Sequence, residues 1–179
     1  MRFDGRASIV GAANNNTAEH ASMKWFWFAL AAIVIILDQY SKFLASTELA
    51  YLRPVEITSW FNLMLAHNEG AAFSFLSDAG GWQRWFFTAI AAIVSVVIAV
   101  WLFRLPAQQT WLACSLALIL GGAIGNLIDR AMLGYVVDFI SVHYGGRYFP
   151  AFNIADSGIC VGAAMLIIDS FRHSDEATA

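Results

Sequence analysis

The sequence of 179 residues is poor in charge, lysine and cysteine. Only 13% of its residues are charged, and its only lysines are Lys24 and Lys42. A soluble domain of this length needs more charged residues on its surface, and scattered cations do not form the basic stretch that binds a nucleic-acid backbone. Cys114 and Cys160 lie within apolar runs and lack the density of a disulfide scaffold. The composition therefore argues against a soluble domain, a nucleic-acid-binding protein and a disulfide-stabilised scaffold.

The sequence is instead rich in apolar side chains. Hydrophobic residues make up 59% of it, and the mean hydropathy is +0.62. A hydrocarbon core about 30 Å thick takes about 20 apolar residues in a helix. We therefore predict an all-α membrane fold, a bundle of four transmembrane helices over residues 25–45, 85–103, 110–128 and 149–168. Four spans put both termini on one side of the membrane and the two long connections on the other.

The chain divides into three parts by composition. Residues 1–22 are polar, and we expect them to be a disordered leader or an expression-tag segment; residues 23–173 form a single membrane domain, and residues 174–179 a polar tail. Between the first two helices, residues 51–65 mix β-branched, aromatic and polar side chains, and Asn68-Glu69-Gly70 is typical of a turn. A small β cradle outside the membrane is expected there.

Ionisable residues inside the spans are the first candidates for function. Burying each costs about 2.5 to 3.5 kcal/mol, so they are usually paired, buried in the bundle and functional. Asp38 and Lys42 are four residues apart on one helix face, which predicts a structural ion pair. The alternative is a contact with a substrate near the mouth of the bundle.

The third span ends in the sequence GGAIGNLIDR. Gly121 and Gly125 allow another helix to approach closely. Asn126, Asp129 and Arg130 follow at helical spacing, which directs an amide, a carboxylate and a guanidinium toward one region. These groups suit the binding of a substrate backbone or the support of a second carboxylate, and a plain interfacial ion pair is the alternative.

Two further carboxylates are expected at the same membrane face. Asp156 opens the fourth span beside Asn153, and Asp138 lies in the connection just before it. Two carboxylates held close together cannot both ionise cheaply, so one keeps a proton while the other can activate water. The amides of Asn68, Asn126 and Asn153 could bind a substrate backbone without adding charge. The pattern indicates peptide hydrolysis by an aspartate pair.

Other functions fit the same residues less well. Asp38 and Asp129 have basic neighbours, Lys42 and Arg130, that can neutralise them. Asp138 and Asp156 have no basic residue within a helical turn, which favours these two as the acting pair. A proton or ion transporter could also use buried polar residues, but no internal repeat is evident. The G-x-G-D signature of presenilin-type proteases, a G-x-S-x-G elbow and an H-E-x-x-H motif are all missing from the sequence. A purely structural membrane protein is the remaining alternative.

Five motifs occur in a characteristic order along the chain: LDQYSK, HNEGAAFS, GNLIDR, VVDF and FNIADS. With them the sequence resembles the signal peptidase II family over about residues 24–172. The resemblance implies a bacterial inner-membrane aspartic peptidase with four helices and a β cradle, its active site toward the periplasm and both termini in the cytoplasm. It also implies that the enzyme removes signal peptides from prolipoproteins, cleaving before a diacylglyceryl-modified cysteine.

The resemblance also assigns roles to residues of this sequence. Asp138 and Asp156 match the catalytic pair. Substrate contacts fall on Asn68, Asn126, Arg130 and Asn153, and structural support on Asp38, Lys42, Gly70 and Asp129. The implied partners are the prolipoprotein, membrane lipid and the inhibitor globomycin, and no cofactor, metal or nucleic acid is expected. We expect a monomer.

Overall fold

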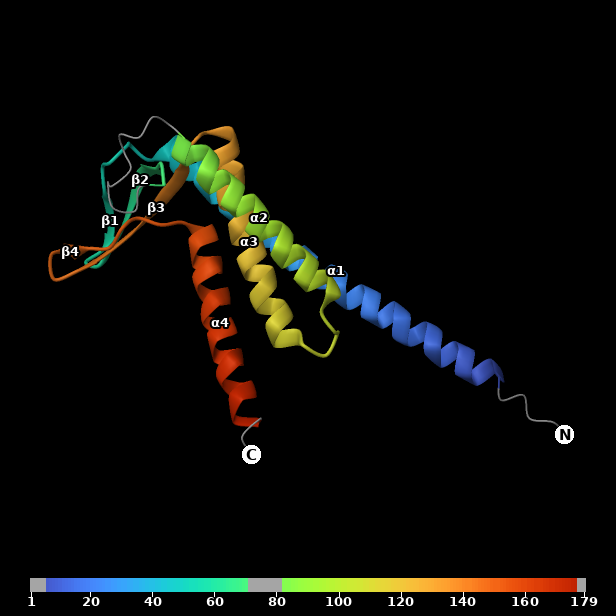
Figure 1. Cartoon of the computed structure of the whole chain (residues 1–179). Coiled ribbons are helices and arrows are strands. Elements are labelled where there is room, and N and C mark those ends of the chain that lie inside the picture. The colour runs from blue at the N-terminus through green and yellow to red at the C-terminus, as the bar shows by residue number, and fades with distance from the viewer. Residues whose placement is uncertain (1–5, 71–81, 177–179) are drawn as a thin grey trace.

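The computed structural model describes residues 6–70 and 82–176, which form four helices and one four-stranded sheet. The helices are α1 (Arg6–Glu48), α2 (Trp82–Arg104), α3 (Thr110–Met132) and α4 (Ile154–Glu176), shown in Figure 1. The strands are β1 (Val55–Thr58), β2 (Phe61–Asn68), β3 (Val136–Tyr144) and β4 (Arg147–Tyr148).

Each helix contains a stretch long and apolar enough to cross a membrane. These stretches are Met23–Glu48, Arg84–Arg104, Thr110–Met132 and Ile154–Phe171. Large apolar side chains point outward along them; Ile93 and Val96 on α2, for example, are each 63% exposed. Lipid tails solvate such side chains, which water does not. The predicted fold, a four-helix membrane bundle with a small sheet, is confirmed.

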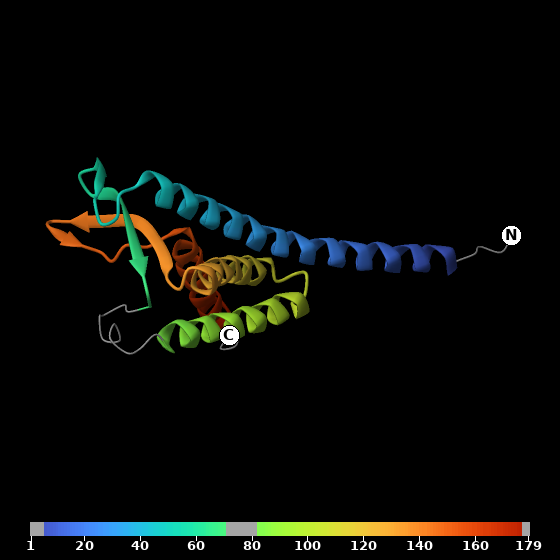
Figure 2. The ribbon, with the colours of Figure 1, turned by 90° about the horizontal axis from the view of Figure 1, so that it is seen from above.

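Helix α1 begins at Arg6, inside the segment 1–22 for which we expected disorder, and Figure 2 shows it as one continuous helix. An existing helix extends at little cost once it is nucleated, and this segment contains no proline. Residues 1–5 and 177–179, parts of the expected leader and tail, lie outside the described residues. The division into leader, single domain and tail stays a prediction.

Helix α3 is the centre of the bundle. The other three helices pack on it, whereas α2 and α4 do not contact each other within the described ranges. In Figure 1, α2 and α4 diverge on either side of α3. The core between α1, α2 and α3 consists of small and branched apolar residues: Ala31, Ile98, Leu102, Leu105, Ala113, Leu116, Ala117 and Leu120.

The sheet lies at one end of the bundle, and both termini lie away from it (Figure 1). Its strands are ordered β1-β2-β3-β4 and are antiparallel throughout. The sequence predicts strands only between the first two helices, but β3 and β4 come from the connection between α3 and α4. Pairing of β2 with β3 places Asp138 opposite Ala66 and Val136 opposite Asn68. The sheet thus joins the two long connections.

Helix α4 begins at Ile154, five residues later than the predicted span. The preceding residues continue the sheet instead, since Phe152 pairs with Ile140. Pro150 lacks a backbone donor and disfavours a helical conformation in the residue before it. Asp156 therefore lies in the first turn of α4.

Candidate active site

Asp138 is buried at the junction of the sheet and the bundle. Strand β3 carries it, and only 2% of its surface is exposed. Its Oδ2 atom accepts a hydrogen bond from the Asn68 side-chain amide at 3.1 Å, and its Oδ1 atom accepts one from the Asn153 side-chain amide at 2.7 Å. Two neutral donors from β2 and from the start of α4 thus hold the carboxylate without a direct cation.

Asp156 is held by the cap of its own helix. The Asp156 backbone N–H donates to Asn153 Oδ1 at 2.8 Å, and the Asn153 backbone N–H donates to Asp156 Oδ2 at 3.3 Å. This reciprocal pair is a capping box, and it fixes both side chains at the helix start. The other carboxylate oxygen, Oδ1, accepts a hydrogen bond from the Asn126 amide at 2.7 Å.

Asn153 links the two carboxylates. It is fully buried, and its side-chain amide donates to the Asp138 carboxylate. Its backbone N–H donates to the Asp156 carboxylate, and its side-chain oxygen accepts from the Asp156 backbone N–H. Its amide nitrogen also lies 3.2 Å from Asn126 Oδ1. The two asparagines therefore bring carboxylates from β3 and α4 to one place, as the sequence predicts.

Burial and the nearby charge of Asp156 raise the pKa of Asp138 from 3.8 to about 6. Burial is the larger cause, because it disfavours the charged carboxylate. Hydrogen bonds from Asn68 and Asn153, and the charge of Lys42, oppose the shift. Asp138 therefore keeps its proton at a higher pH than an ordinary aspartate does.

Arg130 is half-buried near the end of α3, within electrostatic range of Asp156, Asp138 and Asp129. Its backbone is fixed by Arg84 of α2, whose Nε donates to the Arg130 carbonyl at 3.0 Å and whose Nη2 donates to the Ala131 carbonyl at 2.7 Å. A cation near the C-terminus of α3 also complements its dipole. We did not single out Arg84 from the sequence, although its position at the start of an uncharged span was a usable signal.

Lys42 is the buried cation of the site, with 3% of its surface exposed. Its ammonium lies 2.8 Å from Asp38 Oδ2 and 2.9 Å from Asp129 Oδ2. It also donates to Asn126 Oδ1 at 2.9 Å. Asp38 and Lys42 thus form an ion pair within α1. Asp129 of α3 pairs with Lys42 and not with the adjacent Arg130, because α1 packs against that side of α3.

Close packing of α1, α3 and α4 completes this support. Asp38 Oδ1 accepts a hydrogen bond from the Ala155 backbone N–H at 2.8 Å. A methyl group on Gly125 would lie 2.6 Å from Asp38 Oδ2, so only glycine fits there. Gln39, which we did not predict, donates to Asp129 Oδ1 at 2.8 Å and to the Gly125 carbonyl at 3.1 Å.

Asn68 is oriented by the turn that follows β2. The Gly70 backbone N–H donates to Asn68 Oδ1 at 2.9 Å, which leaves the amide nitrogen directed at Asp138. Gly70 has a φ of 95°, a conformation that other residues rarely adopt, and a methyl group there would lie 2.7 Å from the Phe87 ring. Residues 71–74 of the HNEGAAFS motif lie outside the described residues.

The candidate residues thus converge on one polar network below the sheet. Hydrogen bonds or ion pairs connect the side chains of Asp38, Lys42, Asn68, Asn126, Asp129, Asp138, Asn153 and Asp156. Gly70 joins through its backbone, and Arg130 through electrostatic interaction. In the described ranges no group of three or more histidine, cysteine, aspartate or glutamate side chains could hold a metal ion.

Comparisons with known proteins agree in one family. Residues 30–172 match the family model described as signal peptidase (SPase) II. The chain is 57% identical to the lipoprotein signal peptidase of Acinetobacter baumannii over 145 residues, covering 81% of this chain and 82% of that protein. It is also 57% identical to the enzyme of that name from Teredinibacter turnerae over 150 residues, covering 84% and 88%.

Solved structures show the same fold. Two structures, each described as a bacterial membrane enzyme, superpose on this chain with TM-scores of 0.75 and 0.72. Their sequence identities are 30% and 31%. The first covers 84% of this chain and 90% of its own, and the second 80% and 91%.

Proposed function

Because the chain belongs to the signal peptidase II family, we propose that it removes signal peptides from prolipoproteins with Asp138 and Asp156 as its catalytic pair. The observation that carries this proposal is the linkage of the two carboxylates by Asn153 and Asn126. Family membership supports the peptidase activity, and the geometry supports these two residues.

In this mechanism the pair shares its protons unequally. The ionised member removes a proton from water as the water attacks the scissile carbonyl, while the protonated member polarises the carbonyl by donating a hydrogen bond to its oxygen. When the C–N bond breaks, the protonated member gives its proton to the departing amine, and the first member keeps the proton taken from water. The raised pKa of Asp138 supports such sharing, since Asp156 contributes to the shift. Arg130 and the amides of Asn68 and Asn126 lie close enough to the pair to bind a substrate backbone.

We further propose that the protein lies in the bacterial inner membrane as a monomer, with the site toward the periplasm and both termini cytoplasmic. The position of the site at the sheet end of the bundle, away from both termini, supports this topology (Figure 1). Cleavage is proposed to occur before the diacylglyceryl-modified cysteine, and globomycin is proposed to inhibit by occupying the same site.

The test is cleavage of a lipidated prolipoprotein by purified protein in detergent. Asp138→Asn and Asp156→Asn should each lower the rate by about 10²- to 10⁴-fold, because each removes one acid–base group. Glu56→Gln is the matched control, since Glu56 is an exposed carboxylate on β1 and should leave the rate unchanged. Wild-type cleavage by either aspartate variant would refute the assignment.

A further inference from the structure

The tip of the sheet carries an exposed aromatic cleft of about 450 Å³ that the mechanism above does not use. Its lining consists of Trp60, from the turn before β2, and of five residues at the β3–β4 hairpin: Val142, His143, Tyr144, Arg147 and Phe149. Tyr144 is 89% exposed and Phe149 is 72% exposed. Large apolar side chains gathered on a surface indicate a contact with an apolar partner. We call this surface the tip cleft.

The tip cleft lies beside the membrane-spanning part of the bundle. Figure 1 shows the β3–β4 hairpin projecting sideways at the level where α4 begins, and Figure 2 shows its end clear of the helices. The membrane-spanning stretch of α4 starts at Ile154, five residues after Phe149. A surface at this level meets the headgroup layer of the bilayer, where tryptophan and tyrosine side chains concentrate in membrane proteins. The lipid-facing surface of the bundle thus continues onto the hairpin.

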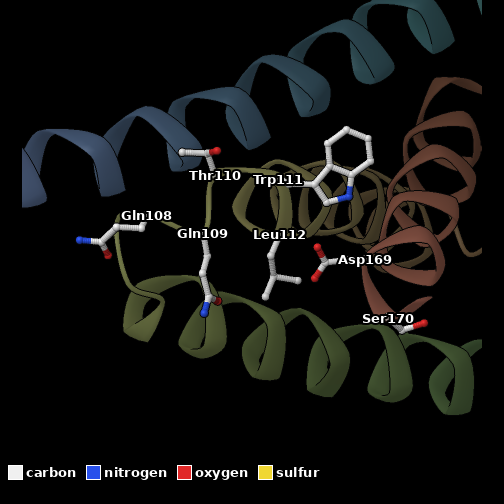
Figure 3. A pocket seen from close by; sticks show the side chains of 7 residues that line it. All are labelled: Gln108, Gln109, Thr110, Trp111, Leu112, Asp169 and Ser170. Carbon is white, nitrogen blue, oxygen red and sulfur yellow. The ribbon is translucent and has the colours of Figure 1, made fainter. Parts of the chain in front are cut away.

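Trp60 presents a polar group to the surroundings of the tip cleft. Its backbone is fixed to the hairpin, because its carbonyl accepts a hydrogen bond from the His143 backbone N–H at 2.9 Å. Its indole N–H donates to no acceptor within residues 6–70 and 82–176. By contrast, Trp111 lines a cavity at the opposite end of the bundle (Figure 3), and its indole N–H donates to the Met165 carbonyl at 3.0 Å. Lipid headgroups supply acceptor oxygens for an indole such as that of Trp60, which has an apolar body and a polar edge.

Arg147 gives the tip cleft a positive charge. Its side chain is exposed and forms no ion pair in the described part of the chain, and no aspartate or glutamate lines the cleft. A guanidinium binds a phosphate through two parallel hydrogen bonds. Each cation near an anionic membrane surface strengthens binding by a factor of about five. The cleft therefore combines aromatic rings suited to the headgroup layer with a cation suited to phosphate.

We propose that the tip cleft docks on the membrane surface beside the bundle, with its aromatic rings in the headgroup layer and Arg147 on an anionic phospholipid. The docked hairpin fixes the height of β3 over the bilayer. Tyr144 follows Asp138 by six residues on this strand, about 20 Å along it. Docking thereby sets the depth of one proposed catalytic carboxylate, although the contact itself does not depend on the proposed reaction.

The experiment follows Trp60 in the full chain, labelled with fluorotryptophan and reconstituted into vesicles of phosphatidylcholine with or without phosphatidylglycerol. The chain has seven tryptophans, and Trp60→Phe identifies the fluorine resonance of Trp60. A nitroxide on the lipid headgroup should broaden this resonance strongly, and a water-soluble paramagnetic agent should broaden it little. The effect of the nitroxide lipid should be larger with phosphatidylglycerol present, and salt should reduce that difference.

Two substitutions separate the charge of the tip cleft from its rings. Arg147→Gln should lower the ratio of docked to free hairpin about fivefold in vesicles with phosphatidylglycerol, and much less in phosphatidylcholine alone. Phe149→Ser should weaken docking in both kinds of vesicle. Arg53→Gln is the matched control, since Arg53 is an exposed cation just before β1, at the opposite edge of the sheet, and its spectra should match those of the wild type.

Several results would contradict membrane docking. These are a Trp60 resonance broadened mainly by the water-soluble agent, and equal effects of Arg147→Gln and Arg53→Gln. Protection of Trp60 that appears only with an added prolipoprotein peptide assigns the tip cleft to the substrate. Protection in detergent that grows with protein concentration assigns it to a second copy of the chain. Each of these outcomes overturns the inference and leaves the catalytic proposal intact.

Discussion

Replacing Lys42 by methionine is the most direct test of how the site is held together. The ammonium of Lys42 is buried, with Asp38, Asp129 and Asn126 oxygens all within 2.9 Å. Lys42→Met keeps the length of the side chain but leaves two buried carboxylates without their cation. Removing one partner of a buried ion pair costs about 3 to 5 kcal/mol, because the remaining charge stays desolvated. We expect the free energy of unfolding to fall by about that amount.

Equilibrium unfolding in detergent, followed by circular dichroism, measures this loss. Lys24→Met is the matched control; Lys24 is half-buried over the Phe103 ring, and its loss should cost about 0.5 to 1 kcal/mol. A triple variant that also carries Asp38→Asn and Asp129→Asn should recover about 2 kcal/mol or more, because no uncompensated charge remains. A Lys42→Met protein within 1 kcal/mol of the wild type would contradict the reasoning, as would a triple variant no more stable than it.

Three further predictions concern the site and its packing. The pKa of Asp138 rises to about 6 on folding, so between pH 4 and 6 the folded state binds this proton more tightly than the unfolded state. The free energy of unfolding should therefore fall, by at most about 3 kcal/mol, as pH rises through that range. Asp138→Asn should flatten this slope when unfolding is measured at several pH values. Asn153→Ala removes the side-chain hydrogen bond to the Asp138 carboxylate and the cap that accepts from the Asp156 backbone N–H. It should lower kcat about 10- to 100-fold in the cleavage assay. Gly125→Ala places a methyl group 2.6 Å from Asp38, and we expect it to lower the free energy of unfolding by about 1 to 3 kcal/mol and with it the midpoint of thermal unfolding. Gly158→Ala is the control: a methyl group there lies 3.2 Å from its nearest neighbour, so the loss of stability should be smaller. Equal midpoints for the two glycine variants, or wild-type kcat for Asn153→Ala, would count against these contacts.

Much of the fold could be predicted from the sequence because lipid imposes strong rules. The four apolar stretches correspond to four helices, since in a bilayer a helix satisfies its own backbone hydrogen bonds. The sheet was predicted only in part. Its third strand, β3, was not predicted, because the VVDFI segment in the connection between the last two helices is a strand only through pairing with β2. Strand formation depends on a distant partner, whereas a helix forms from local contacts.

For the candidate site, too, local features could be predicted from the sequence and contacts between distant segments could not. Residue type and spacing alone singled out Asp138 and Asp156, because they lack a basic residue within a helical turn, and paired Asp38 with Lys42. The sequence could not pair Asp129 with Lys42 or place Gln39 and Arg84, because these contacts join helices far apart in the chain.

The sequence by itself determined that the chain is a membrane helix bundle with polar residues near the ends of its spans, because apolar length and helical spacing are local properties. Tertiary structure alone decided that the carboxylates from β3 and α4 share the asparagines Asn126 and Asn153. That meeting requires α1, α3 and α4 to approach through glycine contacts and β2 to pair with β3. Local spacing encodes neither, because both depend on how distant segments pack.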